Sequence, residues 1–331
     1  MKLKADRMTV VTRLLFAATF AFVIAGATTA SAQVPPRFYW KSLSGAKAVP
    51  LIYMPMNGNA NPADPAHVVT PGASFEALMA PVGYARTFVL FDRAAMAAIL
   101  VPMGRISSDI VAGLATVSAQ TSGYGDPLAE FDINIVGPPP IRNIPDMLRY
   151  EPGFSLDLLV DLAFPLGEYD SEQPLNIGQN RWYGRVGAPI VWQLGAWVPG
   201  RRTTLEFLPS MWIFGDNTDF VGATMETEPM FQVEGHLTRD FAQDLWGSLD
   251  CTWVTGGKAT IDGVAGSELD NLALGYTLGY HINDNLQVTF GYLSTVNDNE
   301  DGDLHMDGFR FSAVYGWHPL VEGMKRLHGG E

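Results

Sequence analysis

Cysteine, long apolar runs and basic side chains are all scarce in this sequence. Its single cysteine, Cys251, excludes an intramolecular disulfide and a thiolate metal cluster. Beyond residue 32 no segment has the eighteen consecutive apolar residues of a membrane-spanning helix, and the nearest, Ala94–Met103, is short and contains a proline. Lys and Arg number 21 against 35 Asp and Glu, giving a net charge of −14. So acidic a chain offers no basic surface to phosphates, which excludes nucleic acid as a partner.

The first 32 residues have the layout of a secretory signal peptide. Leu14–Ala27 is an apolar core, and Ala30-Ser31-Ala32 is an A-x-A cleavage site that follows it directly. The basic residues before the apolar core are Lys2, Lys4, Arg7 and Arg13. We therefore expect residues 1–32 to be removed, so that the mature chain begins at Gln33. An uncleaved N-terminal membrane anchor is the alternative.

The remainder of the chain alternates in the manner of β-strands with one apolar and one polar face. In Phe154–Leu162 the apolar residues keep one parity, while Ser155, Asp157 and Asp161 take the other. Leu128–Val136 and Leu205–Ile213 repeat this pattern. About twelve such runs, of roughly nine to fourteen residues, have the length that a tilted strand needs to cross a bilayer. The predicted fold class is all-β, a transmembrane antiparallel up-and-down β-barrel of about 12 strands.

The lengths of the connections favour one orientation, with the N-terminus in the periplasm. The connections predicted to lie outside are residues 57–81, 106–125, 167–180, 215–224, 255–270 and 297–303. The connections predicted to lie in the periplasm are residues 92–94, 137–151, 198–202, 238–242 and 282–285. Four of these five inner connections are short, as expected for an outer-membrane barrel, and only the proline-rich 137–151 is long.

Aromatic residues occur near the ends of the predicted strands, where the interfacial girdles of a membrane barrel lie. They are Trp182, Tyr183, Trp197, Trp212, Trp253, Tyr280, Tyr292 and Trp317. A soluble β-sandwich or a lipocalin-like barrel would show the same alternation. Its outward face would then be the charged one. The combination of many acids with a heavily aromatic opposite face favours the membrane barrel.

Four short segments carry a resemblance to a known family. They are Tyr124-Gly125-Asp126-Pro127, Ala163–Asp170 (AFPLGEYD), Asn176–Trp182 (NIGQNRW) and Gly195-Ala196-Trp197. With them the chain resembles the MetA-pathway of phenol degradation family, outer-membrane β-barrel transporter-like proteins. The resemblance covers most of the mature chain and is strongest from Gly123 to Trp197. It implies an exported barrel, often found with aromatic-degradation genes, that passes hydrophobic compounds.

The chain departs from other outer-membrane barrels at its C-terminus. Such barrels often finish on an aromatic last residue, whereas here Trp317 closes the last predicted strand and further residues follow. The predicted organisation is a signal peptide (residues 1–32), an outer-membrane β-barrel (residues 33–317) and a C-terminal tail (residues 318–331).

The polar parity of the strands supplies candidates for residues that line the lumen. They are Glu130, Asp132, Asp157, Asp161, Arg185, Glu206, Glu228, Glu234, His236, Asp250 and Arg310. A ring of acids would favour cations or neutral solutes and repel anions. In the alternative, the same side chains pair with one another and fill the interior, because twelve strands lie between filled eight-stranded barrels and open sixteen-stranded channels.

Two further arrangements suggest chemistry only weakly. The acidic loop Asn297–Asp303 could bind Ca²⁺ or bridge lipopolysaccharide through divalent ions, but its spacing is not that of an EF-hand, and a solvated charged loop is simpler. Ser248 or Ser312 could pair with His236 or His281 in a lipid hydrolase, yet no G-x-S-x-G segment supports this. We predict no catalytic residue, metal site or cofactor.

The sequence thus predicts a protein of the bacterial outer membrane that is a transporter or channel for small hydrophobic or aromatic compounds. The expected partners are the lipid bilayer, lipopolysaccharide, the barrel-assembly machinery and a small hydrophobic solute. One alternative is a structural or adhesive barrel with a plugged lumen that acts through its outer loops. The other is an outer-membrane lipid hydrolase.

Overall fold

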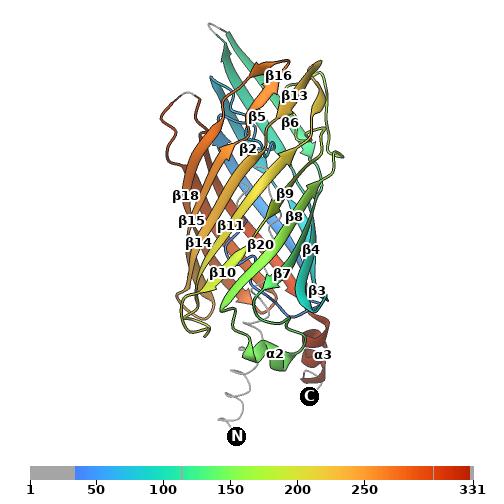
Figure 1. Cartoon of the computed structure of the whole chain (residues 1–331), viewed down its shortest axis with the longest axis vertical. Coiled ribbons are helices and arrows are strands. Elements are labelled where there is room, and N and C mark those ends of the chain that lie inside the picture. The colour runs from blue at the N-terminus through green and yellow to red at the C-terminus, as the bar shows by residue number, and fades with distance from the viewer. Residues whose placement is uncertain (1–33, 113–114, 301, 329–331) are drawn as a thin grey trace.

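Strand β1 (Lys47–Gly58) pairs with β20 (Met306–Trp317), the last strand of the chain, and this pairing closes the sheet into a barrel. Val49 lies opposite Tyr315, and Gly58 lies opposite Met306. The computed structural model describes residues 34–112, 115–300 and 302–328 (Figure 1). The predicted signal peptide, residues 1–32, lies outside the described residues.

The wall contains twelve antiparallel membrane-spanning segments, as predicted. We call each segment a stave, whether it is one continuous strand or two. Eight are single strands: β1, β8 (Phe154–Ala163), β11 (Thr203–Phe214), β14 (Met230–Asp240), β15 (Leu245–Gly256), β18 (Leu269–Asn283), β19 (Leu286–Thr295) and β20. Four are each broken into two strands: β2 (Ala73–Met79) with β3 (Val82–Leu90), β4 (Arg93–Val101) with β5 (Met103–Ala112), β6 (Ala115–Tyr124) with β7 (Leu128–Val136), and β9 (Tyr183–Gly187) with β10 (Ile190–Gln193).

A proline lies in each of the four breaks: Pro81, Pro102, Pro127 and Pro189. Proline has no backbone N–H to give to the ladder, so pairing stops there and resumes a residue or two later. The break between β2 and β3 is visible in the pairing of β1. Residues Met54–Gly58 of β1 pair with β2, whereas Lys47–Leu51 pair with β3.

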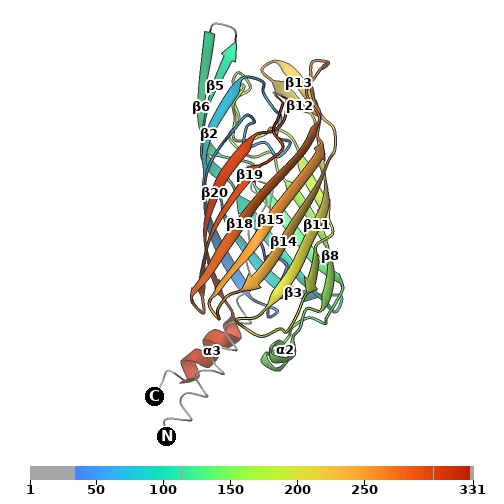
Figure 2. The same ribbon diagram turned by 90° about the vertical axis from the view of Figure 1, so that its left-hand side faces the viewer.

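Four predicted outer loops prove to be partly strand. Residues 57–81 include β2, and residues 106–125 include the end of β5 and all of β6. Residues 215–224 and 255–270 include strands of a small separate sheet. Figure 2 shows β5 and β6 projecting beyond the other strands at one end of the barrel. The outward side chains of a strand that extends beyond the bilayer do not contact lipid and need not be apolar. Accordingly, β6 (ATVSAQTSGY) lacks the large alternating residues on which the prediction relied.

The strand faces follow the pattern of a membrane barrel and not that of a soluble one. Along β11, Glu206 and Trp212 point into the barrel and are buried, whereas Ile213 is 54% exposed on the outside. The apolar parity therefore faces outward, towards lipid. Two of the predicted girdle residues, Tyr183 and Trp212, instead lie buried inside the lumen, because they share the inward parity of their strands.

The two helices of the described residues and the short hairpins lie at one end of the barrel, which we take as the periplasmic end (Figure 1). The helices are α2 (Ile144–Arg149) and α3 (Pro319–His328). The opposite, outer end carries the long connections and a separate four-stranded sheet of β12 (Asn217–Phe220), β13 (Ala223–Thr227), β16 (Ala259–Ile261) and β17 (Val264–Ala265). Within the described ranges, no helix is long and apolar enough to cross a membrane.

Candidate functional site

Residues 34–46, which we call the plug, lie inside the periplasmic half of the barrel. Arg37 and Trp40, both buried, bond the plug to strands β11 and β14 of the wall. The Trp40 indole N–H donates to Glu206 Oε1 at 2.8 Å, and the Arg37 backbone N–H donates to Glu206 Oε2 at 2.7 Å. The Arg37 guanidinium also pairs with Asp240 at 2.6 Å. Two carboxylates of the wall are therefore used to hold the plug.

Lys41 fastens the plug to a different part of the wall. Its ammonium lies between Asp132 of β7, at 3.5 Å, and Asp157 of β8, with which it makes a close ion pair. The Lys41 side chain is 9% exposed, so these charges meet away from bulk water. Only the segment β9–β10 lies between β8 and β11, so these contacts hold the plug along one side of the wall, from β7 to β14.

We expect Lys41→Met to destabilise the folded barrel, because the substitution leaves Asp132 and Asp157 buried without their cation. Breaking a buried ion pair by removing one partner costs about 3–5 kcal/mol. The measurement is the urea midpoint of the chain refolded in liposomes. Lys47→Met, a half-buried residue at the start of β1, is the matched control. Equal midpoints for the two variants would contradict the role given to Lys41.

The acids and bases predicted to line the lumen mostly lie inside the barrel, and many of them are paired. Arg185 is fully buried between Asp161, at 2.7 Å, and Glu234, at 2.9 Å. His236 and Asp250 meet at 2.8 Å. The predicted residues that are buried are Glu130, Asp132, Asp157, Asp161, Arg185, Glu206, Glu234, His236 and Asp250, and Arg310 is half-buried.

Glu228 was wrongly placed among them. It precedes β14, which begins at Met230, and its exposed carboxylate pairs with Lys258 at 3.0 Å outside the lumen. The side chain of Glu228 therefore does not point into the lumen, unlike those of the alternate residues of β14. Asp132, Asp157, Asp161, Glu234 and Asp250 form local pairs with an arginine, a lysine or a histidine, so these carboxylates do not make a continuous ring around an open pore.

Residues 59–72, which join β1 to β2 and which we call the inward loop, close the barrel from the outer side. Ala60, Ala63 and Ala66 are almost fully buried. They belong to the same apolar cluster as inward-facing wall residues such as Trp212 and Met230. Small side chains let this segment fit among the larger ones of the wall. The lumen is thus filled by a segment of the chain at each end.

Three of the four segments that carried the family resemblance meet at one point beside the inward loop. Asp126 accepts hydrogen bonds from the backbone N–H of Gly167 and of Gln179, both at 2.8 Å. The backbones of Gly125, Gly167 and Gly178 touch there, since a Cβ on Gly167 would lie 2.6 Å from the Gly125 carbonyl carbon and 2.8 Å from the Gly178 Cα. Segments 124–127, 165–168 and 176–181 together form what we call the clamp.

The clamp holds the inward loop by three polar contacts. Arg181 pairs with Asp64 at 2.9 Å, with both side chains buried. Gln179 Nε2 donates to the Ala63 carbonyl, and Asn61 Nδ2 donates to the Asn176 carbonyl, each at 3.0 Å. Asn176, Gln179 and Arg181 were quoted for the family resemblance but not recognised as a site, and their partners in the inward loop were not singled out. Their proximity depends on partners more than a hundred positions apart in sequence, so no local pattern could reveal it.

We expect Gly167→Ala to loosen the clamp, because the added methyl group meets backbone atoms that cannot rotate away. Overpacking of this kind costs about 1–3 kcal/mol. Gly195→Ala, where a Cβ would meet no atom within 4 Å, is the control. Protease cleavage between β1 and β2 on folded, refolded protein measures the effect. Faster cleavage in the first variant alone is the expected result, and equal cleavage of both would refute the packing argument.

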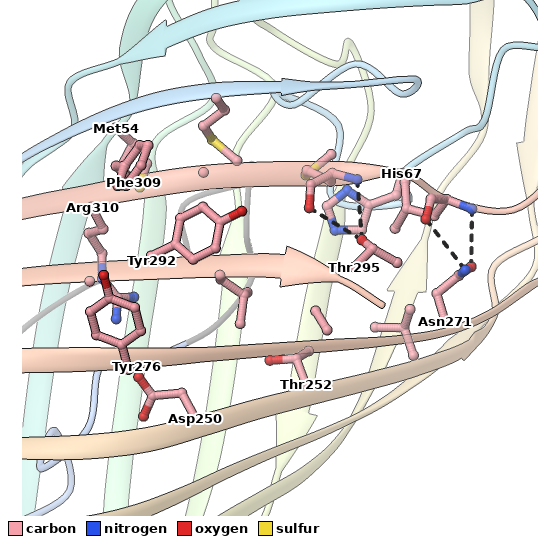
Figure 3. A pocket seen from close by; sticks show the side chains of 18 of the residues that line it. Met54, His67, Asp250, Thr252, Asn271, Tyr276, Tyr292, Thr295, Phe309 and Arg310 are labelled. Atoms are coloured by element: carbon pink, nitrogen blue, oxygen red, sulfur yellow. Dashed lines mark hydrogen bonds between the residues drawn. The ribbon is translucent and has the colours of Figure 1, made fainter. Parts of the chain in front are cut away.

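Two cavities remain beside the inward loop. The outer cavity has a volume of about 250 Å³ and is lined by the loop, by β2, β5 and β6, and by the clamp. The inner cavity, about 60 Å³, lies against β15, β18, β19 and β20 and contains Asp250, Arg310 and His67 in its lining (Figure 3). The inner cavity has room for a few water molecules, whereas an aromatic ring needs about 150 Å³.

The weaker chemical candidates do not come together in the described part of the chain. His236 contacts Asp250, and the hydroxyl of Ser312 bonds that of Thr289 at 2.6 Å. In the acidic loop, Asp303 accepts backbone N–H groups from Asn299 and Glu300, both at 2.9 Å. His305 bonds Asp298 and lowers the pKa of this exposed carboxyl. No group of three or more His, Cys, Asp or Glu suited to a metal ion occurs among the described residues.

A closed barrel of twelve antiparallel staves with lipid-facing apolar side chains defines a bacterial outer-membrane β-barrel. The model of the family described as "MetA-pathway of phenol degradation" matches residues 58–312, and the chain belongs to this family. The match confirms the family resemblance noted in the sequence. No curated protein matches the chain in sequence.

Solved structures of other outer-membrane proteins share the architecture. An outer membrane channel from Pseudomonas putida F1 superposes with a TM-score of 0.69 and 20% identity, covering 86% of this chain and all of that one. The KdgM porin gives 0.41 and 8% identity over 81% of this chain and 99% of the porin. The beta domain of a Bordetella autotransporter gives 0.46 and 8% over 83% and 100%. The last two similarities are too distant to add to the argument.

Proposed function

We propose that the protein transports small, largely apolar compounds, aromatic ones included, across the outer membrane, and that it does so through separate cavities and not through a continuous water-filled pore. One observation carries the proposal: the plug and the inward loop fill the lumen from its two ends and leave a mainly apolar cavity near the outer mouth. Polar solutes and ions would need a continuous hydrated path.

Uptake by whole cells tests this function. Cells that lack the chain are compared with the same cells after it is restored, using a radiolabelled aromatic hydrocarbon and a radiolabelled sugar of similar size. Faster entry of the hydrocarbon alone is the expected result. Faster entry of the sugar, or no change in either compound, would contradict the proposal.

A second candidate, the structural or adhesive barrel, is favoured by the four-stranded sheet at the outer mouth. β12, β13, β16 and β17 pair with one another and stand outside the barrel wall. A binding surface built on this sheet would not depend on the lumen. Replacing β16–β17 by a short glycine linker should then abolish adhesion of the cells to a surface and leave uptake of the hydrocarbon unchanged. Unchanged adhesion by the folded variant would contradict the adhesive role.

We propose further that the protein is not an enzyme and binds no cofactor or metal. The solved structure that it resembles with a TM-score of 0.69 is an outer membrane channel and not an enzyme. We also propose that residues 1–32 are removed on export, that residues 33–317 form the barrel with a tail at 318–331, and that the assembly machinery and lipopolysaccharide are partners. The buried charged residues, Arg185 among them, would then secure the plug and would not select ions.

A further inference from the structure

The outer cavity is a candidate ligand site because its size exceeds what packing would leave by chance. Protein interiors contain few voids larger than a water molecule. The outer cavity measures about 250 Å³. A cavity of about 150 Å³ accepts benzene, so this one has room for a single ring that carries one or two short substituents.

The walls of the outer cavity are mainly apolar. Phe75 of β2, Ile110 of β5 and Ala119 of β6 contribute one side, and Leu175 and Phe220 come from the outer loop and the small sheet. Phe75 and Leu175 are buried in the fold itself. Aromatic and branched side chains that converge from separate elements are the usual lining of a small-molecule site.

The polar groups of the lining are almost all uncharged. Among the described residues, Asp64 is the only acidic residue that lines the cavity, and its charge is matched by Arg181. None of the described lining residues is basic, so an anionic ligand would find no cation among them. Ser108 and Thr70 supply hydroxyl groups that can bond a hydroxyl on the ligand. Burial raises the pKa of Tyr169, whose hydroxyl therefore stays protonated; it donates to the Asp219 carbonyl at 2.9 Å.

From the volume, the apolar walls and the absence of a free charge in the lining, we propose that the outer cavity is the site at which the barrel first binds its solute, and that this solute is an uncharged single-ring compound bearing a hydroxyl group. The proposal rests on the proposed transport function and adds its site and ligand class. The inward loop lines both cavities, through Asp64 and Val68 on one side and His67 on the other. A bound solute would thus lie directly against the segment that separates the two.

Two adjacent serines of β5 give a matched test. Ser108 is buried on the inward face and lines the cavity, whereas Ser107, on the opposite face of the strand, is half-buried and does not line it. The mature full-length chain and the variants Ser108→Leu and Ser107→Leu are placed in nanodiscs and titrated with 4-fluorophenol at neutral pH by fluorine NMR, with protein-free nanodiscs as the blank. Ala119→Leu, on another strand, is a second cavity-filling variant. Heat-modifiable migration on gels shows that each variant is folded.

We expect Ser108→Leu and Ala119→Leu to weaken binding by about tenfold or more, since a side chain then occupies the ligand's volume, and a tenfold change corresponds to about 1.4 kcal/mol. Ser107→Leu should bind like the unmodified chain. The anion 4-fluorobenzoate should bind at least about tenfold more weakly than 4-fluorophenol, because burying an unpaired charge is costly. The assignment of the site would be wrong if the unmodified chain gave the same fluorine NMR signals as the protein-free nanodiscs. It would also be wrong if the folded Ser108→Leu and Ser107→Leu variants bound 4-fluorophenol equally.

The same variants separate this inference from the transport function. If the unmodified chain speeds entry of the aromatic hydrocarbon but the serine variants bind 4-fluorophenol equally, the site is wrong and the function stands. If Ser108→Leu abolishes binding while the unmodified chain speeds no uptake, the site stands and the function is wrong.

Discussion

A chain that lacks residues 34–44 and also carries Asp64→Ala with Arg181→Ala is expected to conduct cations in discrete steps in a planar bilayer. The plug and the inward loop fill successive parts of one lumen, so they act as resistances in series. Opening either one should raise the conductance little, whereas opening both should raise it at least about tenfold. Cation preference follows because carboxylates that now hold the plug, Glu206, Asp132 and Asp157 among them, would then face water.

The controls for this experiment are the full chain, the truncated chain and the Asp64→Ala/Arg181→Ala chain, each shown to be folded by its mobility before and after heating. The full chain should remain near the baseline of the protein-free bilayer. Large steps from the full chain would show that the plug does not close the lumen. A silent but folded triple variant would show that some other part of the barrel closes it.

Arg181→Met is expected to lower the free energy of unfolding by about 3–5 kcal/mol, because it strands the buried Asp64 carboxylate. Replacing both partners, as in Asp64→Leu with Arg181→Met, should recover much of the loss, since no uncompensated charge is then buried. Urea unfolding of the refolded chains measures the free energy of unfolding of Arg181→Met, of Asp64→Leu and of the double variant. The coupling between the two single substitutions is the quantity of interest.

Lys258→Met is the matched control for this cycle. It removes the Lys258–Glu228 pair, in which the two side chains are 33% and 57% exposed. Exposed ion pairs contribute roughly 0–1 kcal/mol, so the effect should be small. Additive effects of Asp64→Leu and Arg181→Met, or a loss from Lys258→Met as large as that from Arg181→Met, would mean that the Asp64–Arg181 pair does not hold the inward loop.

The wall of the barrel was predictable from the sequence because each stave carries its own signal. Strands such as β8 and β11 alternate strictly, since one face meets lipid and the other the lumen. The prediction failed where that contrast ends. β6 lies partly beyond the bilayer, and Glu228 lies in the loop before β14. Trp212 followed the parity of its strand and not the expected preference of tryptophan for the interface.

The contents of the lumen were not predictable in the same way. Residues 34–46 and 59–72 have no periodicity, and they owe their places to partners far away in the sequence. The Lys41 and Asp157 positions are 116 apart, and those of Asp64 and Arg181 are 117 apart. The sequence did show that the inward acids could pair and fill the interior, but it could not show that the cations of the plug and the clamp would be their partners.

The most direct test of transport compares two fluxes in one preparation of proteoliposomes that contain the purified mature chain. Entry of a radiolabelled, uncharged aromatic compound is measured beside the release of a trapped small cation. The closed lumen with its apolar outer cavity predicts faster entry of the aromatic compound than in protein-free liposomes, with cation release unchanged. Rapid cation release with no change in the entry of the aromatic compound would contradict transport of apolar compounds through a lumen that is closed to ions.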